Sequence, residues 1–336
     1  MTLWSQLADR MPKTFPVQVI PKVHWSQLTP TYQDAEPGLI NAALARANRR
    51  PSGNWYVFAA STDIRDDRPF GTRVAGLEIV AWRDQQGSLR VGPAACPHLG
   101  ANLATGKVEC GGLTCRWHGL RLEGGREFGW KPLPAHDDGV LVWVRLDNIG
   151  GEPPLDTPVI PTRPTGDRLI VVTRLVGVCE PDDVIANRLD PWHGAWFHPY
   201  SFTQLEVISA PPIDVDEAND RFQVAVTFRV GRFGVPVIAE FTTPERRTIV
   251  MRIVDGEGVG SVVETHATPM GPGPDGRPRT AVVEAVVAQS DRARFRKSLR
   301  VAPLITPMVR FASARLWRDD LEYAERRYAV RAKETH

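Results

Sequence analysis

Two short segments of the chain each place a cysteine close to a histidine, and this pattern restricts the fold more than any other feature. The first segment has the spacing Cys96-x-His98 and the second has the spacing Cys115-x-x-His118, with sixteen residues between them. Glycine and proline in these segments predict tight loops rather than regular structure. Two thiolates and two imidazoles form a full set of metal ligands, so we expect two hairpin loops that face each other across a metal site.

Two kinds of metal site use equal numbers of cysteine and histidine ligands. One is a structural zinc ion. The other is a [2Fe–2S] cluster in which two histidines replace two cysteines on one iron, which raises its reduction potential. Zinc loops generally pair like ligands at a spacing of about two to four residues, whereas each segment here pairs a cysteine with a histidine. The spacing therefore favours the iron–sulfur cluster over zinc.

The two segments resemble the cluster-binding loops of Rieske proteins. Arg116 stands where proline is usual in that family, and Leu120 stands where an aromatic residue is common, but neither position is a ligand. High-potential Rieske proteins carry an extra cysteine in each loop, and the two form a disulfide. Ala101 and Trp117 occupy those places here. The resemblance therefore implies a cluster of lower potential, as in Rieske oxygenases and their ferredoxins.

Length and cysteine usage indicate a protein of two domains in a reducing compartment. The chain has 336 residues, and two of its four cysteines, Cys110 and Cys179, lie outside the ligand set with nothing that requires them to pair. The N-terminus lacks a basic start followed by an apolar run, and no apolar stretch approaches about eighteen residues. We therefore expect a cytoplasmic protein without a signal peptide or transmembrane segment. A net charge of +2 gives no reason to expect nucleic-acid binding.

Composition divides the chain into four parts. Residues 1–50 form a proline-rich extension, in which residues 37–50 carry apolar side chains at helical spacing and predict one helix. Residues 51–150 alternate short apolar runs with turns, which predicts an all-β domain that holds both Cys/His segments. Residues 151–166 contain five prolines and two glycines, and this composition predicts a semi-rigid linker. Residues 167–336 form the remaining domain.

The remaining domain mixes strand and helix patterns. Apolar runs predict strands over residues 169–178, 222–229, 248–254, 259–268 and 279–289. Residues 182–198 and 291–333 have helical patterns, with Pro303 and Pro307 as expected interruptions. A sheet flanked by helices is the simplest arrangement, so the sequence predicts the α+β class for the whole chain.

A second set of polar residues lies at the start of this domain. Asn187, Asp190, His193 and His198 have the spacing Asn-x-x-Asp-x-x-His-x4-His. Two histidines and a carboxylate are the usual ligands of a ferrous site that keeps open positions for O2 and substrate. Each residue alone also fits a helix end, because Asp190 and His198 both precede a proline. The four together, among tryptophan and phenylalanine, favour a dry metal site.

With both motifs in view, residues 51–336 resemble the α subunit of a Rieske non-heme iron oxygenase, whose catalytic domain has the helix-grip fold. The resemblance implies that Cys96, His98, Cys115 and His118 bind the [2Fe–2S] cluster. It also implies that His193 and His198 bind a mononuclear Fe(II). By the same resemblance, Asp190 bridges the two centres by accepting hydrogen bonds from His193 and from His118 of a neighbouring subunit.

The resemblance also implies a third iron ligand far downstream, an aspartate on a helix. Asp320 fits this position slightly better than Asp319, and both acids also suit a solvated helix face. Asn187 matches a position that lies beside the iron in some members. Arg326 and Arg327 replace the glutamine-rich ending that is common in the family.

The activity implied is oxidation with O2, namely mono- or dioxygenation of a small apolar organic substrate. Electrons would come from NAD(P)H through a separate reductase, with or without a ferredoxin, because the chain lacks a glycine-rich dinucleotide fingerprint. The family pattern implies a homotrimer in which each cluster serves the iron of the next subunit. The alternative is a Rieske-type electron-transfer protein with a non-catalytic C-terminal binding domain.

A cluster of cations precedes and enters the C-terminal helical region. It could receive an acidic ferredoxin, and it equally fits a solvated helix face. Its members are Arg292, Arg294, Arg296, Lys297, Arg300, Arg310, Arg315 and Arg318.

Overall fold

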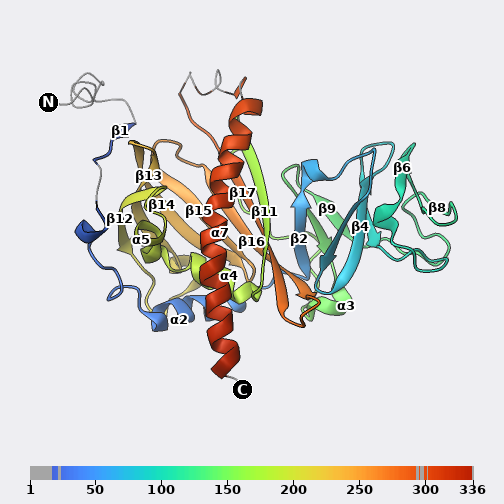
Figure 1. The fold of residues 1–336 in the computed structure, drawn as a ribbon, viewed down its shortest axis with the longest axis horizontal. Coiled ribbons are helices and arrows are strands. Elements are labelled where there is room, and N and C mark those ends of the chain that lie inside the picture. Colours follow the sequence, from blue (N-terminus) through green and yellow to red (C-terminus); the bar gives the residue numbers. More distant parts are fainter. Residues whose placement is uncertain (1–16, 22–23, 293–294, 296–298, 301, 335–336) are drawn as a thin grey trace.

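The computed structural model describes residues 17–21, 24–292, 295, 299–300 and 302–334. It consists of a smaller β domain and a larger domain in which a broad sheet is crossed by a long C-terminal helix (Figure 1). The predicted α+β class is confirmed by this architecture. Residues 1–16 of the predicted extension lie outside the described residues. So do Arg294, Arg296 and Lys297 of the cation cluster.

The smaller domain contains three antiparallel sheets of three strands each within the described residues. The first joins β2 (Trp55–Ala60), β10 (Leu141–Arg145) and β9 (Ala135–Asp137). The second joins β3 (Phe70–Val74), β4 (Leu77–Arg83) and β5 (Leu89–Pro93). The third joins β6 (Lys107–Glu109), β7 (Gly112–Thr114) and β8 (Arg121–Leu122) at the tip of the domain (Figure 1), and the Cys115–His118 loop connects β7 to β8.

Strand β2 connects the smaller domain to the larger one because both of its faces are buried. Successive side chains of a strand point to opposite sides. Tyr56 and Phe58 pack in the core of the smaller domain, whereas Trp55 and Val57 pack against the large sheet. A continuous apolar run was therefore the correct signal for this strand.

The larger domain is built on an antiparallel sheet that has eight strands within the described residues. The strand order is β11-β17-β16-β15-β14-β13-β12, and β1 (Gln18–Val19) pairs with β14. The bounds are β11 Leu169–Gly177, β12 Phe202–Ser209, β13 Phe222–Val230, β14 Phe233–Glu245, β15 Thr248–Gly256, β16 Val262–Pro272 and β17 Pro278–Ala288.

The helices lie on one side of this sheet and around its lower end (Figure 1). They are α2 (Pro37–Asn48), α3 (Asp147–Gly150), α4 (Pro181–Arg188), α5 (Gly194–Phe197) and α7 (Ala302–Glu334). Short 3-10 turns occur at Trp25–Gln27, Ser61–Asp63, Leu103–Thr105, Pro191–His193 (η4) and Glu217–Asn219. Among the described residues, none of these helices is long and apolar enough to cross a bilayer.

Helix α7 packs on α4 and the sheet through Trp317, Leu321 and Ala324, which join the same buried core as α2. The expected interruption by two prolines is wrong, because α7 continues through Pro307. Pro303 lies in the first turn, where its missing N–H would have no partner inside the helix. Pro307 removes one hydrogen bond from the second turn, and the packed remainder of the helix tolerates that loss.

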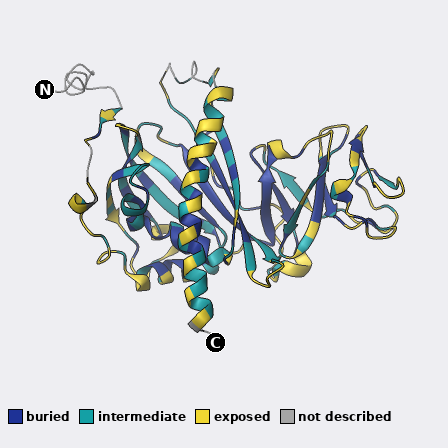
Figure 2. Cartoon of the chain, viewed as in Figure 1, coloured by how far each residue is buried: buried dark blue, intermediate teal, exposed yellow. Residues whose placement is uncertain are grey.

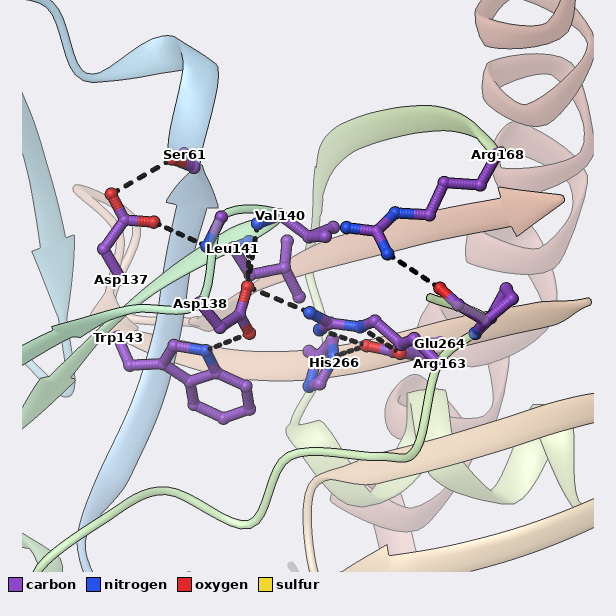
Figure 3. Close-up of polar contacts among 12 residues, drawn as sticks. Ser61, Asp137, Asp138, Val140, Leu141, Trp143, Arg163, Arg168, Glu264 and His266 are labelled. Carbon is purple, nitrogen blue, oxygen red and sulfur yellow. Dashed lines mark hydrogen bonds and ion pairs between the residues drawn. The ribbon is translucent and has the colours of Figure 1, made fainter. Parts of the chain in front are cut away.

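A buried ionic network ties the two domains to the segment between them (Figure 3). Arg163 forms ion pairs with Asp138 of the smaller domain at 2.9 Å and with Glu264 of β16 at 2.6 Å. Trp143 donates a hydrogen bond to Asp138 at 3.0 Å, and His266 contacts Glu264 at 3.3 Å. Burial alone would raise the pKa of Glu264, but hydrogen bonds from Arg163 and His266 hold that pKa below its ordinary value.

Replacing Arg163 by alanine should destabilise the protein strongly, because it leaves two buried carboxylates without their shared cation. Removing one partner of a buried ion pair lowers the free energy of unfolding by about 3–5 kcal/mol. Urea denaturation of the variant should show this loss. Arg65→Ala is the matched control, because its ion pair with Asp67 is exposed and should contribute nothing measurable. Equal midpoints for both variants would contradict the role given to Arg163.

Candidate metal centres

The two Cys/His loops have the same backbone turn. The N–H of Gly100 donates to the carbonyl of Cys96 at 2.8 Å, and the N–H of Gly119 donates to the carbonyl of Cys115 at 3.1 Å. Both glycines have positive φ, at 76° and 74°, a conformation that costs other residues free energy. This repeated turn explains why each loop needs its glycine and why the loops can oppose each other symmetrically.

The four candidate ligands lie at two depths. Cys96 and Cys115 are buried, whereas His98 and His118 are exposed, with their ring centroids 4.8 Å apart. Among the described residues, the group of side chains arranged to hold a single metal ion is His193, His198 and Asp320, and it does not include these four. A tetrahedral zinc ion needs its ligand atoms about 4 Å apart. The arrangement fits a two-iron cluster with cysteines inside and histidines at the surface.

Exposed apolar side chains surround the histidine edge. Leu99 is 63% exposed and Trp117 is 60% exposed, and they flank His98 and His118 in sequence. Apolar groups gathered around an exposed functional group are typical of a docking surface. The histidine edge of this site is therefore exposed and bordered by apolar side chains.

The second candidate centre brings together residues that are far apart in sequence. His193 lies at the end of η4, His198 follows α5, and Asp320 lies in the middle of α7. Asp320 Oδ1 is 3.1 Å from His193 Nε2 and 2.9 Å from His198 Nε2, and the three ligand atoms lie within 4.8 Å of one another. Pro191 breaks the helical path between α4 and α5, so both histidines can face the same point. Two imidazoles and one carboxylate fit a ferrous ion with open positions.

The geometry separates the two adjacent aspartates. Asp320 is 2% exposed and faces both histidines. Asp319 accepts a hydrogen bond from Tyr200 and lies 3.6 Å from His198 Nδ1, on the outer side of that ring. Burial would raise the pKa of Asp320, but hydrogen bonds from His193 and His198 outweigh it and hold that pKa far below its ordinary value. Asp320 is therefore an anionic group aimed at the two imidazoles.

Asn187 supports the same carboxylate from α4. Its Nδ2 donates to Asp320 Oδ1 at 3.1 Å, and the side chain is fully buried. On the other side of His193, the backbone carbonyl of Asp190 contacts Nδ1. This contact leaves Nε2 of His193 to face Asp320, and Tyr200 OH at 3.4 Å from His198 Nδ1 has the same effect on His198. Fixing one ring nitrogen orients the other toward a metal.

Asp190 is a buried carboxylate with one oxygen still lacking a hydrogen-bond partner within the described residues. Its Oδ2 accepts a hydrogen bond from Tyr323 at 3.3 Å and lies 3.9 Å from His193 Nδ1, whereas its Oδ1 has no such partner. Burial raises the pKa of Asp190, and the neighbouring His193 opposes this effect. Buried acceptors are rarely left unpaired, so Oδ1 is an available acceptor at the edge of this centre.

Sequence reasoning missed Tyr200 and Tyr323, which contact Asp319 and Asp190. Two local signals could have identified them. Tyr200 follows His198 by two residues. Tyr323 follows Asp320 by about one helical turn, so both side chains lie on the same side of α7.

An apolar cavity adjoins His193 and His198. Phe228 and Phe241 line it, whereas Phe233 on the β13–β14 hairpin is 38% exposed. The other lining residues come mainly from α5, β12, β13 and β15, and they include Phe202, Leu205, Val224, Val226 and Met251. Arg188 and Asp190 are the charged residues of its wall other than the histidines. The cavity is small, about 50 Å³, and its mainly apolar lining disfavours water.

Two family models match this chain. The Rieske [2Fe–2S] domain matches residues 54–138, and a domain of unknown function, DUF5914, matches residues 149–335, which is more than half of the chain. The chain is a Rieske protein of the DUF5914 family. The recognition of a Rieske domain from its two loops is thereby confirmed.

Several curated relatives of this Rieske protein are named as oxygenases or oxygenase components. Aminopyrrolnitrin oxygenase from Pseudomonas fluorescens is 35% identical over 111 residues, which is 30% of this chain and 30% of that protein. The vanillate O-demethylase oxygenase subunit from a Pseudomonas species is 38% identical over 182 residues, 48% of this chain and 49% of that protein. The match spans 30%, 22% and 21% of the length of the first three curated relatives, so this Rieske protein covers less than a third of each.

Solved structures share the fold of this Rieske protein along most of its length. Dicamba monooxygenase bound to dicamba has a TM-score of 0.62 and 18% identity, covering 84% of this chain and 90% of that chain. The terminal oxygenase of carbazole 1,9a-dioxygenase from Novosphingobium has a TM-score of 0.55 and 15% identity, covering 90% of each chain. These likenesses establish a Rieske oxygenase fold for both domains.

Proposed function

We propose that this protein is the oxygenase component of a Rieske non-heme iron oxygenase system that hydroxylates a small apolar organic substrate. The observation that carries the proposal is the convergence of His193, His198 and Asp320, whose ligand atoms lie within 4.8 Å of one another beside an apolar cavity. A protein that only carried electrons would have no use for such a site. The named activities of the curated relatives support the same reaction class.

The residues of this chain divide the work as follows. When bound, ferrous iron would supply O2 activation and the [2Fe–2S] cluster would supply electrons. His193 and His198 present Nε2 as ligands, and Asp320 contributes the third ligand and one negative charge. Asn187 holds the carboxylate of Asp320, and Tyr200 with Asp319 holds the far side of His198. The surrounding phenylalanines keep water out and orient an apolar substrate.

Electron delivery between subunits is the second part of the proposal. The cluster loops and α5 lie at opposite ends of one chain (Figure 1), so the cluster of a chain does not reach its own second centre. Asp190 Oδ1 lacks a partner within the described chain, and an exposed His118 of another copy would donate to it. A cyclic homotrimer satisfies every such site in turn.

A hollow beside Asp190 would receive the neighbouring cluster tip. Asp190, His193 and Trp196 line one side of it, and the segment Pro30–Ala35 contributes the other. Trp196 donates to the carbonyl of Thr29 at 3.0 Å, which holds this N-terminal segment in place. Part of the N-terminal extension would therefore belong to the subunit contact.

The electron source would be a separate NAD(P)H-dependent reductase, acting directly or through a ferredoxin. A solved complex of similar fold, with a TM-score of 0.51 and 15% identity, joins the oxygenase and ferredoxin of carbazole 1,9a-dioxygenase. We propose a donor of this class for the present protein.

Metal and sulfide analysis of the purified protein tests this function. An oxygenase should contain about three irons and two sulfides per chain, whereas a Rieske-type electron carrier should contain about two of each. The third iron should be ferrous and removable by a chelator without loss of the visible spectrum of the cluster. Two irons in fully metallated protein would leave only the electron carrier.

A further inference from the structure

The outward face of the first three turns of α7 carries three large apolar side chains. Leu304 is 74% exposed, Met308 is 70% exposed and Phe311 is 64% exposed. Their spacing of four and three residues places them in one line along the helix. We call these three residues the α7 ridge. Pro303, Pro307 and Ala312 are exposed apolar neighbours of the ridge, and Arg310 is an exposed cation beside it.

The ridge is not part of the protein core. The opposite side of the same turns faces inward, where Ser313 is buried and donates to Glu284. Figure 2 shows exposed residues along the upper turns of α7. Single exposed apolar side chains are ordinary, but a continuous line of three large ones marks a surface that binds something.

The charge around the ridge has one sign. Between residues 292 and 318 the sequence contains eight cations and no aspartate or glutamate. Of these, Arg300, Arg310 and Arg315 are exposed and lie next to the ridge in sequence. The guanidinium of Arg315 stacks 3.8 Å from the ring centroid of Tyr200. An apolar line bordered by cations complements a surface that is apolar inside and anionic outside.

We propose that the α7 ridge binds the surface of an anionic lipid bilayer. Interfacial helices insert large apolar side chains below the headgroups while arginines contact lipid phosphates. The ridge is a convex helix face, which a fluid lipid surface can surround. A hollow lined by Phe311, Arg315 and Tyr200 continues from the ridge toward the segment that carries His198. Membrane contact would therefore lie beside the metal site, where apolar molecules dissolved in lipid could enter.

Vesicle flotation of the full-length protein with both metal centres tests this proposal, with phosphatidylcholine vesicles prepared with and without phosphatidylglycerol. The protein should float with the anionic vesicles and separate from them at high salt. The double variant Leu304→Asp/Met308→Asp should bind at least about tenfold more weakly. Arg300→Ser and Arg310→Ser should each weaken binding about fivefold, because one cation near the surface contributes about 1 kcal/mol.

Two matched variants define the site. Leu304→Met/Met308→Leu keeps the ridge apolar and should bind like the unchanged protein, and Val330→Asp changes an exposed apolar residue at the other end of α7 and should also bind. Failure of the unchanged protein to float would overturn the proposal. Normal flotation of the double aspartate variant would also overturn it. The same holds if vesicles bound neither the unchanged protein nor this variant while the variant lost its trimer or its ferredoxin binding, because the ridge would then be a protein contact.

Iron content and the cluster spectrum are measured on the same samples. Vesicle binding does not need turnover, so the lipid proposal and the oxygenase proposal can fail separately.

Discussion

Replacing Asp320 by alanine is expected to remove the mononuclear iron and abolish product formation, while the Rieske cluster remains intact. Asp320 Oδ1 is within 3.1 Å of both histidine Nε2 atoms, so no other group among the described residues can take its place without moving α7. A metal ion supplies several kcal/mol of transition-state stabilisation, so its loss should lower turnover at least about 10³-fold. Iron analysis, the visible spectrum and product formation measure the three parts of this result.

Asp319→Asn is the matched control for this experiment. The adjacent carboxylate contacts Tyr200 and the outer nitrogen of His198, so the variant should keep its iron. Loss of an outer hydrogen-bond partner of a ligand lowers metal affinity or activity by about 10- to 100-fold. If Asp319→Asn lost the iron and Asp320→Ala kept it, the assignment of the third ligand would be reversed.

Replacing Asp190 by asparagine should slow electron transfer between subunits without removing either metal. The substitution keeps the size of the side chain but removes its charge and one acceptor oxygen, and Oδ1 is the atom left without a partner inside the chain. Reoxidation of the pre-reduced cluster in a single turnover should become about 10- to 100-fold slower. Stopped-flow absorbance of the cluster measures this rate.

Tyr323→Phe provides the comparison for Asp190. It removes one hydrogen bond to the same carboxylate and keeps the aromatic ring beside His193. The loss of one hydrogen bond is worth about 0.5–1.5 kcal/mol, so its effect on the rate should stay within about tenfold. A normal rate in Asp190→Asn would refute the bridging role, whatever the result with Tyr323→Phe.

The parts of the two centres that are local in sequence could be predicted without a structure. Cys96 and His98 share one loop, and His193 and His198 share one segment, so their spacing alone indicates a common site. Strand β2 could also be predicted, because its apolar run is uninterrupted. In each case the signal lies in residues close together in the chain.

Features that depend on distant packing were missed or left open. Strand β14 contains Pro236, and β12 carries polar residues and irregular pairing, so neither gave a clear strand pattern. Both strands form because they pair with β13, which lies between them in the sheet. For the choice between Asp319 and Asp320, however, a signal was available. Trp317, Leu321 and Ala324 form the buried face of α7, and Asp320 lies on that face.

The ionic network at Arg163 has a consequence for how this protein works. Because the network and the double-sided burial of β2 join the two domains firmly, the smaller domain has no freedom to swing toward its own chain's iron site. In a monomer, the reduced cluster would then be too far from the iron site to transfer its electron. Activity would therefore depend on protein concentration, because dilution below the dissociation constant of the oligomer would stop turnover while leaving both centres loaded.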